Sequence, residues 1–94
     1  MSSTHLVVVP KDGEVIVEPL ATRARRLQAE ARACAREHVE QLRAGLAEVA
    51  RISGEIAEGG DAYPVGAREI ARRLVEEAAS QALTLSAINE RMVN

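Results

Sequence analysis

Three residues with side chains suited to metal binding follow one another at intervals of four residues: Glu30, Cys34 and His38. In a helix this spacing places them along one face. Cysteine thiolate and histidine imidazole are good zinc ligands, and two copies of the chain could supply two of each. A small buried cysteine and a core histidine explain the same residues without a metal, because cysteine is commonly buried where no metal binds. We adopt this second interpretation and predict no metal and no cofactor.

Catalytic groups are sparse in the rest of the chain. The other histidine is His5, near the N-terminus. No serine–histidine–aspartate set, phosphate-binding loop or pair of carboxylates stands out in the sequence. We therefore expect a protein that is not an enzyme.

The segment from Gly66 to Leu74 looks like the first helix of a helix-turn-helix motif. That motif requires a turn, usually with glycine, followed by a recognition helix. Here Leu74 runs on into Val75-Glu76-Glu77-Ala78 without a residue that breaks a helix. The sequence therefore predicts one continuous helix in this region.

The N-terminal part of the chain carries a second pattern found in DNA-binding proteins. A predicted hairpin with a glycine turn is followed by Pro19 and by the string Arg23-Ala24-Arg25-Arg26-Leu27. This order resembles AbrB-type swapped-hairpin regulators over about Leu6 to Leu27. The resemblance implies an intertwined N-terminal dimer that contacts nucleic acid through Arg23, Arg25 and Arg26. The helices expected after this segment are far longer than that family's module, so we do not assign the chain to the family.

Composition limits the classes of protein to which the chain can belong. Its 94 residues fit one domain at most, and its formal net charge of -2 argues against a dedicated nucleic-acid binder. A single cysteine excludes an intrachain disulfide and fits a reducing compartment. The first residues lack the pattern of a signal peptide, and no apolar run approaches the roughly 20 residues that span a bilayer. We expect a cytoplasmic protein.

Two long helices and a short β-segment are expected to position these residues. Residues 1–19 are predicted to form an N-terminal arm or β-hairpin, with LVVV and EVIV as strands around Pro10-Lys11-Asp12-Gly13. Residues 20–94 are predicted to form a two-helix hairpin, with helices at about 20–58 and about 65–92. Pro19 suits the start of the first helix, and Gly59-Gly60 suits its end. The short connection favours two antiparallel helices.

Apolar residues recur at helical spacing in both predicted helices, which indicates that each packs against other helices. The stripe on the first helix is wider than a two-stranded seam needs. We therefore predict a mainly α protein, an antiparallel helical hairpin that dimerises into a four-helix bundle. His38 projects onto the centre of the stripe and is expected to be buried. The residues expected to pack in the core or dimer are Leu27, Cys34, His38, Leu42, Val49, Leu74, Leu85 and Ile88.

Charged residues flank the stripe of the first helix, with arginines such as Arg36 on one edge and glutamates such as Glu48 on the other. Two antiparallel copies of this helix alone would bring like charges together. Folding the second helix back relieves this, because Arg73 then comes near Glu48. An exposed ion pair contributes only about 0.2–1 kcal/mol, so it would set the register of the helices more than their stability.

The function that fits these features best is that of a small helical interaction, scaffolding or regulatory protein that acts as a homodimer. Its partners would be a second copy of itself and, in a wider assembly, another protein. The alternative is a DNA-binding transcriptional regulator or antitoxin that uses the N-terminal segment and its arginines. Strong, salt-dependent retention on DNA would favour the alternative.

Overall fold

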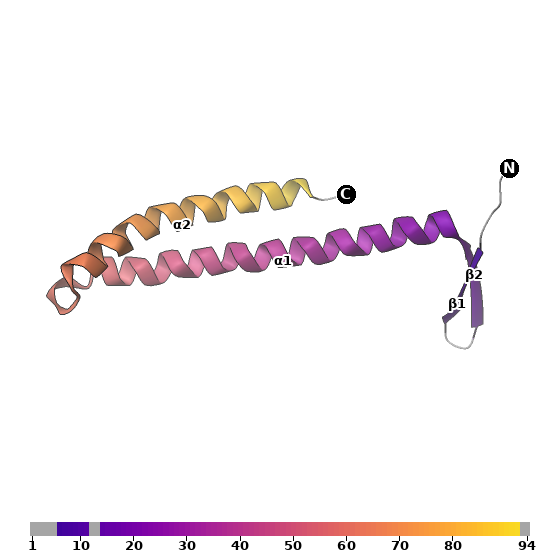
Figure 1. Cartoon of the computed structure of the whole chain (residues 1–94), viewed down its shortest axis with the longest axis horizontal. Helices are drawn as coiled ribbons and strands as arrows, with labels where there is room; N and C mark the ends of the chain where they lie inside the picture. The colour runs from indigo at the N-terminus through magenta and orange to yellow at the C-terminus, as the bar shows by residue number, and fades with distance from the viewer. Residues whose placement is uncertain (1–5, 12–13, 93–94) are drawn as a thin grey trace. The chain divides into compact units, whose positions relative to one another are not determined.

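The computed structural model describes residues 6–11 and 14–92, and the side chains of residues 17–92 (Figure 1). Within these ranges the elements are two short strands, two long helices and one turn of 3-10 helix. The chain divides into two compact units, Met1–Cys34 and Ala35–Asn94. The division falls inside the first long helix, and the helical hairpin lies in the second unit.

The first unit contains an antiparallel β-hairpin. Strand β1 (Leu6–Lys11) pairs with strand β2 (Glu14–Pro19), from Leu6 opposite Pro19 to Lys11 opposite Glu14. The two runs rich in valine and isoleucine form these strands because β-branched residues favour the pleated backbone. The turn was predicted at Pro10-Lys11-Asp12-Gly13, but strand β1 extends through Pro10 and Lys11, which pair with Val15 and Glu14. Asp12, Gly13 and His5 lie outside the described residues.

Two long helices make up most of the remaining chain. Helix α1 (Leu20–Ala57) begins directly after Pro19, and helix α2 (Val65–Arg91) begins directly after Pro64. Proline is tolerated at a helix start because the first turn cannot use its missing N–H. The observed ends differ from the predicted ends by one residue at most. Helix α2 is continuous through Val75-Glu76-Glu77-Ala78, so the prediction of an unbroken helix is confirmed.

The connection between the helices depends on two glycines and a tyrosine. A single 3-10 turn, η1 (Gly60–Ala62), follows α1. Gly60 has a φ of 76°, a conformation that residues with a Cβ atom rarely adopt. A Cβ atom at Gly59 would overlap the ring of Tyr63, and the Tyr63 N–H donates to the Gly60 carbonyl at 3.1 Å. The predicted glycine stop at the end of α1 is therefore confirmed.

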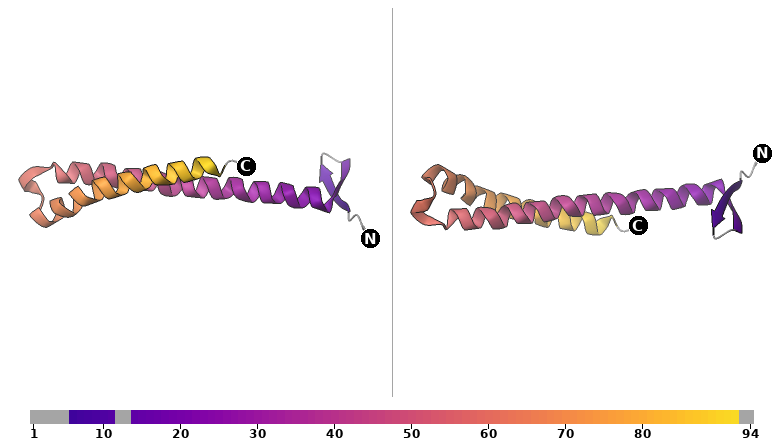
Figure 2. Two further views of the ribbon diagram at one scale, coloured as in Figure 1. Left: turned by 90° about the horizontal axis from the view of Figure 1, so that it is seen from above. Right: turned by 90° about the horizontal axis from the view of Figure 1, so that it is seen from below.

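Beyond this turn the chain reverses direction and α2 runs back beside the second part of α1. Figures 1 and 2 show the two helices side by side. The predicted antiparallel helical hairpin is confirmed.

Buried and half-buried residues alternate at intervals of three and four along both helices of the hairpin. This is the spacing of helices that pack as a coiled coil, and we call these positions the seam. On α1 the seam consists of Arg36, Val39, Arg43, Leu46, Ala50, Ser53 and Ala57. On α2 it consists of Arg68, Ala71, Val75, Ala78, Ala82, Leu85, Asn89 and Met92.

Small side chains occupy the most buried positions of the seam. Among the residues whose side chains are described, those that are at most 8% exposed are Ser53, Ala71, Ala78 and Ala82. Alanine and serine let two helices approach closely, but they remove little apolar surface from water. The hairpin therefore leaves most of its larger apolar side chains on its outer surfaces.

The predicted ion pair between Arg73 and Glu48 is absent from the hairpin, and that prediction is wrong for the single chain. Glu48 bonds Arg51 on the same helix, and Arg51 also bonds Glu55 at 2.7 Å. Arg73 and Glu48 lie on the outer surfaces of their helices because the seam residues face the neighbouring helix. Among residues 35–92, the ion pairs join residues three or four positions apart within one helix.

Candidate interaction face

One side of the hairpin is both apolar and exposed. It is formed by residues that lie next to the seam and repeat at the same alternating spacing. On α1 these are Ala35, His38, Leu42, Gly45, Val49, Ile52 and the half-buried Ile56, and on α2 the same spacing gives Ile70, Leu74, Glu77, Gln81, Thr84 and Ile88. We call these residues the open face. Leu42 is 56% exposed and Ile88 is 44% exposed, although both are large apolar side chains.

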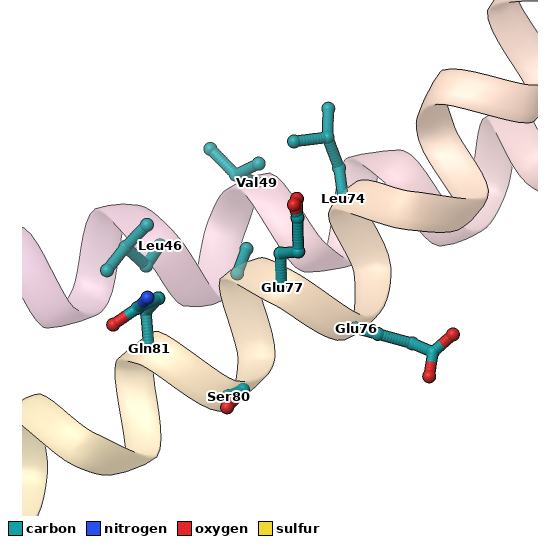
Figure 3. Close-up of a pocket in the computed structure, with 8 residues that line it drawn as sticks. Leu46, Val49, Leu74, Glu76, Glu77, Ser80 and Gln81 are labelled. Atoms are coloured by element: carbon teal, nitrogen blue, oxygen red, sulfur yellow. The ribbon is translucent and has the colours of Figure 1, made fainter.

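A groove of about 570 Å³ crosses the middle of the open face between α1 and α2 (Figure 3). Leu46 and Ala78, both seam residues, line it from the inside. Val49 and Leu74 stand beside it on neighbouring helices, and Gln81 lies next to Leu46. The other lining residues from α2 are Glu76, Glu77 and Ser80, so the groove is apolar on its α1 side and carries two carboxylates on its α2 side.

His38 lies in the open face, and the single chain leaves it exposed. With Ala35, Val39 and Leu42 it lines a second hollow of about 400 Å³. The predicted burial of His38 is therefore not found within one chain. The reason is that the seam passes through the neighbouring Val39, so His38 is turned away from α2. A second molecule over this face would be needed to bury the imidazole.

The opposite side of the hairpin is built from smaller residues. Its groove, of about 390 Å³, is lined by Arg43, Ala47, Ala50, Ala79, Ala82, Leu83 and Ser86. Leu83 is a large apolar residue outside the open face, and it is 73% exposed. Alanines offer little apolar area per residue, and most of the large apolar side chains that the hairpin exposes lie on the open face.

Two ion pairs within α1 neutralise charges on the outer surface of this helix, Glu48–Arg51 beside the open face and Glu40–Arg43 toward the opposite side. The hydrogen bond from Arg51 lowers the pKa of Glu48, and the hydrogen bond from Arg43 lowers the pKa of Glu40. The Arg43–Glu40 pair has an N–O distance of 2.6 Å. These carboxylates are held in their ionised form by arginines of the same helix. The row from Ala35 to Ile56 itself carries no formal charge while His38 is neutral.

The residues predicted to pack in the core or dimer separate into three groups. Those in the open face are His38, Leu42, Val49, Leu74 and Ile88. Leu85 is half-buried in the seam, whereas Leu27 and Cys34 are exposed on the part of α1 that belongs to the first unit. The structure therefore brings most of the predicted residues onto one continuous surface rather than into the interior of the chain.

The arginines predicted to contact nucleic acid lie near the start of α1 and are exposed. Arg26 bonds Glu18 at 2.7 Å and Glu30 at 3.5 Å. The hydrogen bond to Glu18 is the main reason that the pKa of Arg26 is raised. Arg23 and Arg25 form no ion pair with described residues, so their guanidinium groups are more available to bind a phosphate than that of Arg26.

Polar residues in the seam were not identified by the sequence pattern. Arg36, Arg43 and Asn89 occupy seam positions, although arginines were expected along the edge of the apolar stripe. Arg36 Nε and Asn89 Oδ1 are buried and have no hydrogen-bond partner among the described residues. The alternating spacing of small residues, such as Ala71 and Ala78, is the signal that would have located the seam.

Three further observations bear on the class of protein. Within the described residues, no group of three or more histidine, cysteine, aspartate or glutamate side chains is placed to hold a metal ion. No helix in the described ranges has an apolar stretch of the length that a membrane span requires. No protein-family model, curated protein or solved structure matches the chain.

Proposed function

We propose that this protein is a small helical interaction protein, scaffolding or regulatory in role, that acts as a homodimer and has no catalytic activity. Two hairpins would join through their open faces to form a four-helix bundle. The observation that carries this proposal is the uncharged row from Ala35 to Ile56 on α1, exposed as far as Ile52, which lies beside a seam filled mostly by small residues.

The exposed area of the chain supports a second copy as a partner. The chain exposes 7183 Å², whereas a compact monomer of 10.1 kDa would expose about 5,300 Å². The excess of roughly 1,900 Å² is shared by both units of the chain, and it is more than the roughly 800 Å² that each partner buries in an interface of standard size. Apolar surface removed from water contributes about 25 cal/mol per Å², so covering the open face would stabilise the fold considerably.

The positions of the seam and the open face support the same arrangement. Each helix of a four-helix bundle packs against two neighbours, and therefore needs two adjacent apolar rows. Helix α1 has such rows, one running through Val39 and Leu46 in the seam and one through Leu42 and Val49 in the open face. Both rows keep the alternating spacing of three and four residues that coiled-coil packing requires.

The double variant Leu42→Glu/Val49→Glu tests this proposal. It places two carboxylates in the open face. The free-energy cost of burying these unpaired charges in an interface would exceed the free energy gained by covering the apolar surface. We expect this variant to be monomeric at micromolar concentration, as measured by light scattering after gel filtration, while circular dichroism reports its helix content.

Leu83→Glu is the matched control, because Leu83 is an exposed leucine on the opposite side of the hairpin. We expect Leu83→Glu to remain dimeric. A dimeric mass for the Leu42→Glu/Val49→Glu variant would contradict the proposal. Loss of the dimer in Leu83→Glu alone would show that the opposite side, and not the open face, forms the interface.

We further propose that the protein works in the cytoplasm. The exposed thiol of Cys34 supports this location, because a reducing compartment would keep two copies from forming an adventitious disulfide.

One observation favours a second candidate function, a DNA-binding transcriptional regulator or antitoxin. Strand β2 leads through Pro19 directly into α1, whose first turns expose Arg23 and Arg25. Such a regulator would be retained on a DNA column at low salt and released as the salt concentration rises, because bound phosphates release counterions. Arg23→Ala/Arg25→Ala would then abolish retention. Passage of the unmodified protein through the column would exclude this candidate.

A further inference from the structure

Gly45 is a glycine in the middle of α1 whose presence the single chain does not explain. Glycine lowers helix propensity relative to alanine. An added Cβ atom at Gly45 would meet no described heavy atom within 4 Å, whereas one at Gly59 would overlap the Tyr63 ring. Gly45 also lies in the open face, between Leu42 and Val49. A glycine in such a place permits the backbone of another helix to come close.

The residues on either side of Gly45 are suited to a two-fold axis through this glycine. If two copies of α1 cross there in antiparallel orientation, Leu42 lies opposite Val49 of the second copy, and His38 lies opposite Ile52. Every position of the row from Ala35 to Ile56 would then meet an uncharged position, and the smallest residue would sit where the two backbones are closest.

Gln81 occupies the corresponding place on α2. It lines the same groove and lies beside Leu46, the residue that follows Gly45 (Figure 3). Leu74 and Ile88 lie two helical turns before and after it on the open face. An axis through Gly45 that also passes through Gln81 would set Leu74 against Ile88 of the second copy. An amide can both donate and accept, so two Gln81 side chains can bond each other across the axis.

We propose that the two-fold axis of the dimer passes through Gly45 and Gln81, so that the hairpins face each other with their turns at opposite ends. This inference rests on the homodimer proposed above and specifies its geometry. Because Gly45 and Gln81 lie near the middle of the hairpin, this axis lets the two open faces overlap along most of their length.

The alternative arrangement, with both turns at the same end, fits the charges less well. In that arrangement α1 packs against α2 of the second copy. The uncharged row from Ala35 to Ile56 would then cover Glu77 of the second copy, whose carboxylate would be buried without a partner. In the proposed arrangement Glu77 instead lies opposite Thr84 of the second copy, whose hydroxyl can donate to the carboxylate. The sequence pattern predicted that antiparallel copies of α1 would bring like charges together, but Arg36 and Arg43 lie in the seam and not on this edge. On the outer edge Gln41 lies opposite Glu48, so that like charges do not face each other directly.

Cysteine crosslinking distinguishes the two arrangements. In a Cys34→Ser background, Gly45→Cys should form an intermolecular disulfide rapidly with diamide as the oxidant, because residues on a close two-fold axis come within disulfide distance. Ala47→Cys, on the opposite side of α1, is the matched control and should not crosslink. If Gly45→Cys and Gln81→Cys each fail to crosslink alone but form a mixed disulfide when the two single variants are combined, the turns lie at the same end and the proposed axis is wrong.

Two alanine variants test the axis without any crosslink. Gly45→Ala should weaken the dimer about tenfold, because the added methyl groups push the two backbones apart. Gly54→Ala is the control, since its Cβ atom would meet only Val75 Cγ2 at 4.0 Å, an ordinary contact. We expect its dissociation constant to stay unchanged. A Gly45→Ala dimer as tight as that of the unmodified protein would overturn the proposed axis, whereas an unmodified protein that is monomeric would overturn the homodimer itself.

Discussion

Asn89 Nδ2 donates a hydrogen bond to the backbone carbonyl of Arg36 at 3.2 Å, and this bond joins the end of α2 to α1. Both residues occupy seam positions, where their neighbours are mostly small or apolar. A polar residue inside a seam can fix the register of two helices at some cost in stability. The Asn89–Arg36 bond thus selects one register of the hairpin at the end far from its turn.

Asn89→Ala should destabilise the hairpin, because alanine cannot donate to the Arg36 carbonyl. We expect a loss of about 1 kcal/mol in the free energy of unfolding, as measured by urea denaturation. Glu90→Ala changes an exposed neighbour and should leave the free energy nearly unchanged. Equal stabilities for Asn89→Ala and the unmodified protein would show that the bond has no stabilising role.

Alanine substitution should have different effects on stability at Gly60, in the turn between the helices, and at Gly66, in α2. Gly60→Ala forces a Cβ atom into a left-handed conformation, which costs about 1–2 kcal/mol. Gly66→Ala lies in α2, where no described heavy atom comes within 4 Å of the new Cβ atom, and it should be neutral or slightly stabilising. Thermal melts of both variants compare the two effects. A stable Gly60→Ala protein would mean that the turn adopts another backbone geometry.

Stability should decrease as the pH falls through the carboxylate range. The arginine bonds lower the pKa of Glu40 and Glu48 below the ordinary value of 4.5 in the folded state. A lowered pKa means that the folded protein binds protons less readily than the unfolded chain. The stabilisation is therefore present above pH 4.5 and is lost as the pH falls below it.

The double variant Glu40→Gln/Glu48→Gln should show a smaller difference in melting temperature between neutral and acidic pH. Glu37→Gln/Glu76→Gln removes the same number of carboxylates, neither of which forms an ion pair within the described residues. If both double variants change the pH dependence equally, the ion pairs with Arg43 and Arg51 are not its source.

Periodicity in the sequence was sufficient to locate the elements of this fold. Pro19 and Gly59-Gly60 marked the ends of α1, and the unbroken pattern after Leu74 excluded a turn there. These features are local, because proline and glycine act on the backbone of their own residues. The helices consequently end where their sequences predict.

The division of the apolar stripe into two rows could not be predicted in the same way. Val39 and Leu46 lie in the seam, whereas His38 and Leu42 lie in the open face, although all four belong to one broad apolar surface of α1. Which part faces α2 depends on the small residues of α2, and on the direction in which the Gly59-Gly60 turn sends the chain. Both are properties of the pair of helices and not of either helix alone.

His38→Leu should be tolerated and should tighten the dimer. In the proposed dimer His38 is covered by apolar residues, and replacing its polar ring by an apolar side chain removes a desolvation penalty. We expect a lower dissociation constant for His38→Leu by sedimentation velocity, and no stoichiometric zinc by elemental analysis of the unmodified protein. A zinc equivalent that disappears with His38→Leu would instead identify a metal site formed between two copies.

The homodimer is tested most directly by the molar mass of the unmodified protein in solution. Sedimentation equilibrium at micromolar concentration should give about 20 kDa, twice the 10.1 kDa of one chain. The mass should fall toward that of one chain only on strong dilution, with a loss of helix content in parallel. A folded, helical species of 10.1 kDa at all concentrations would contradict the proposal that a second copy covers the open face.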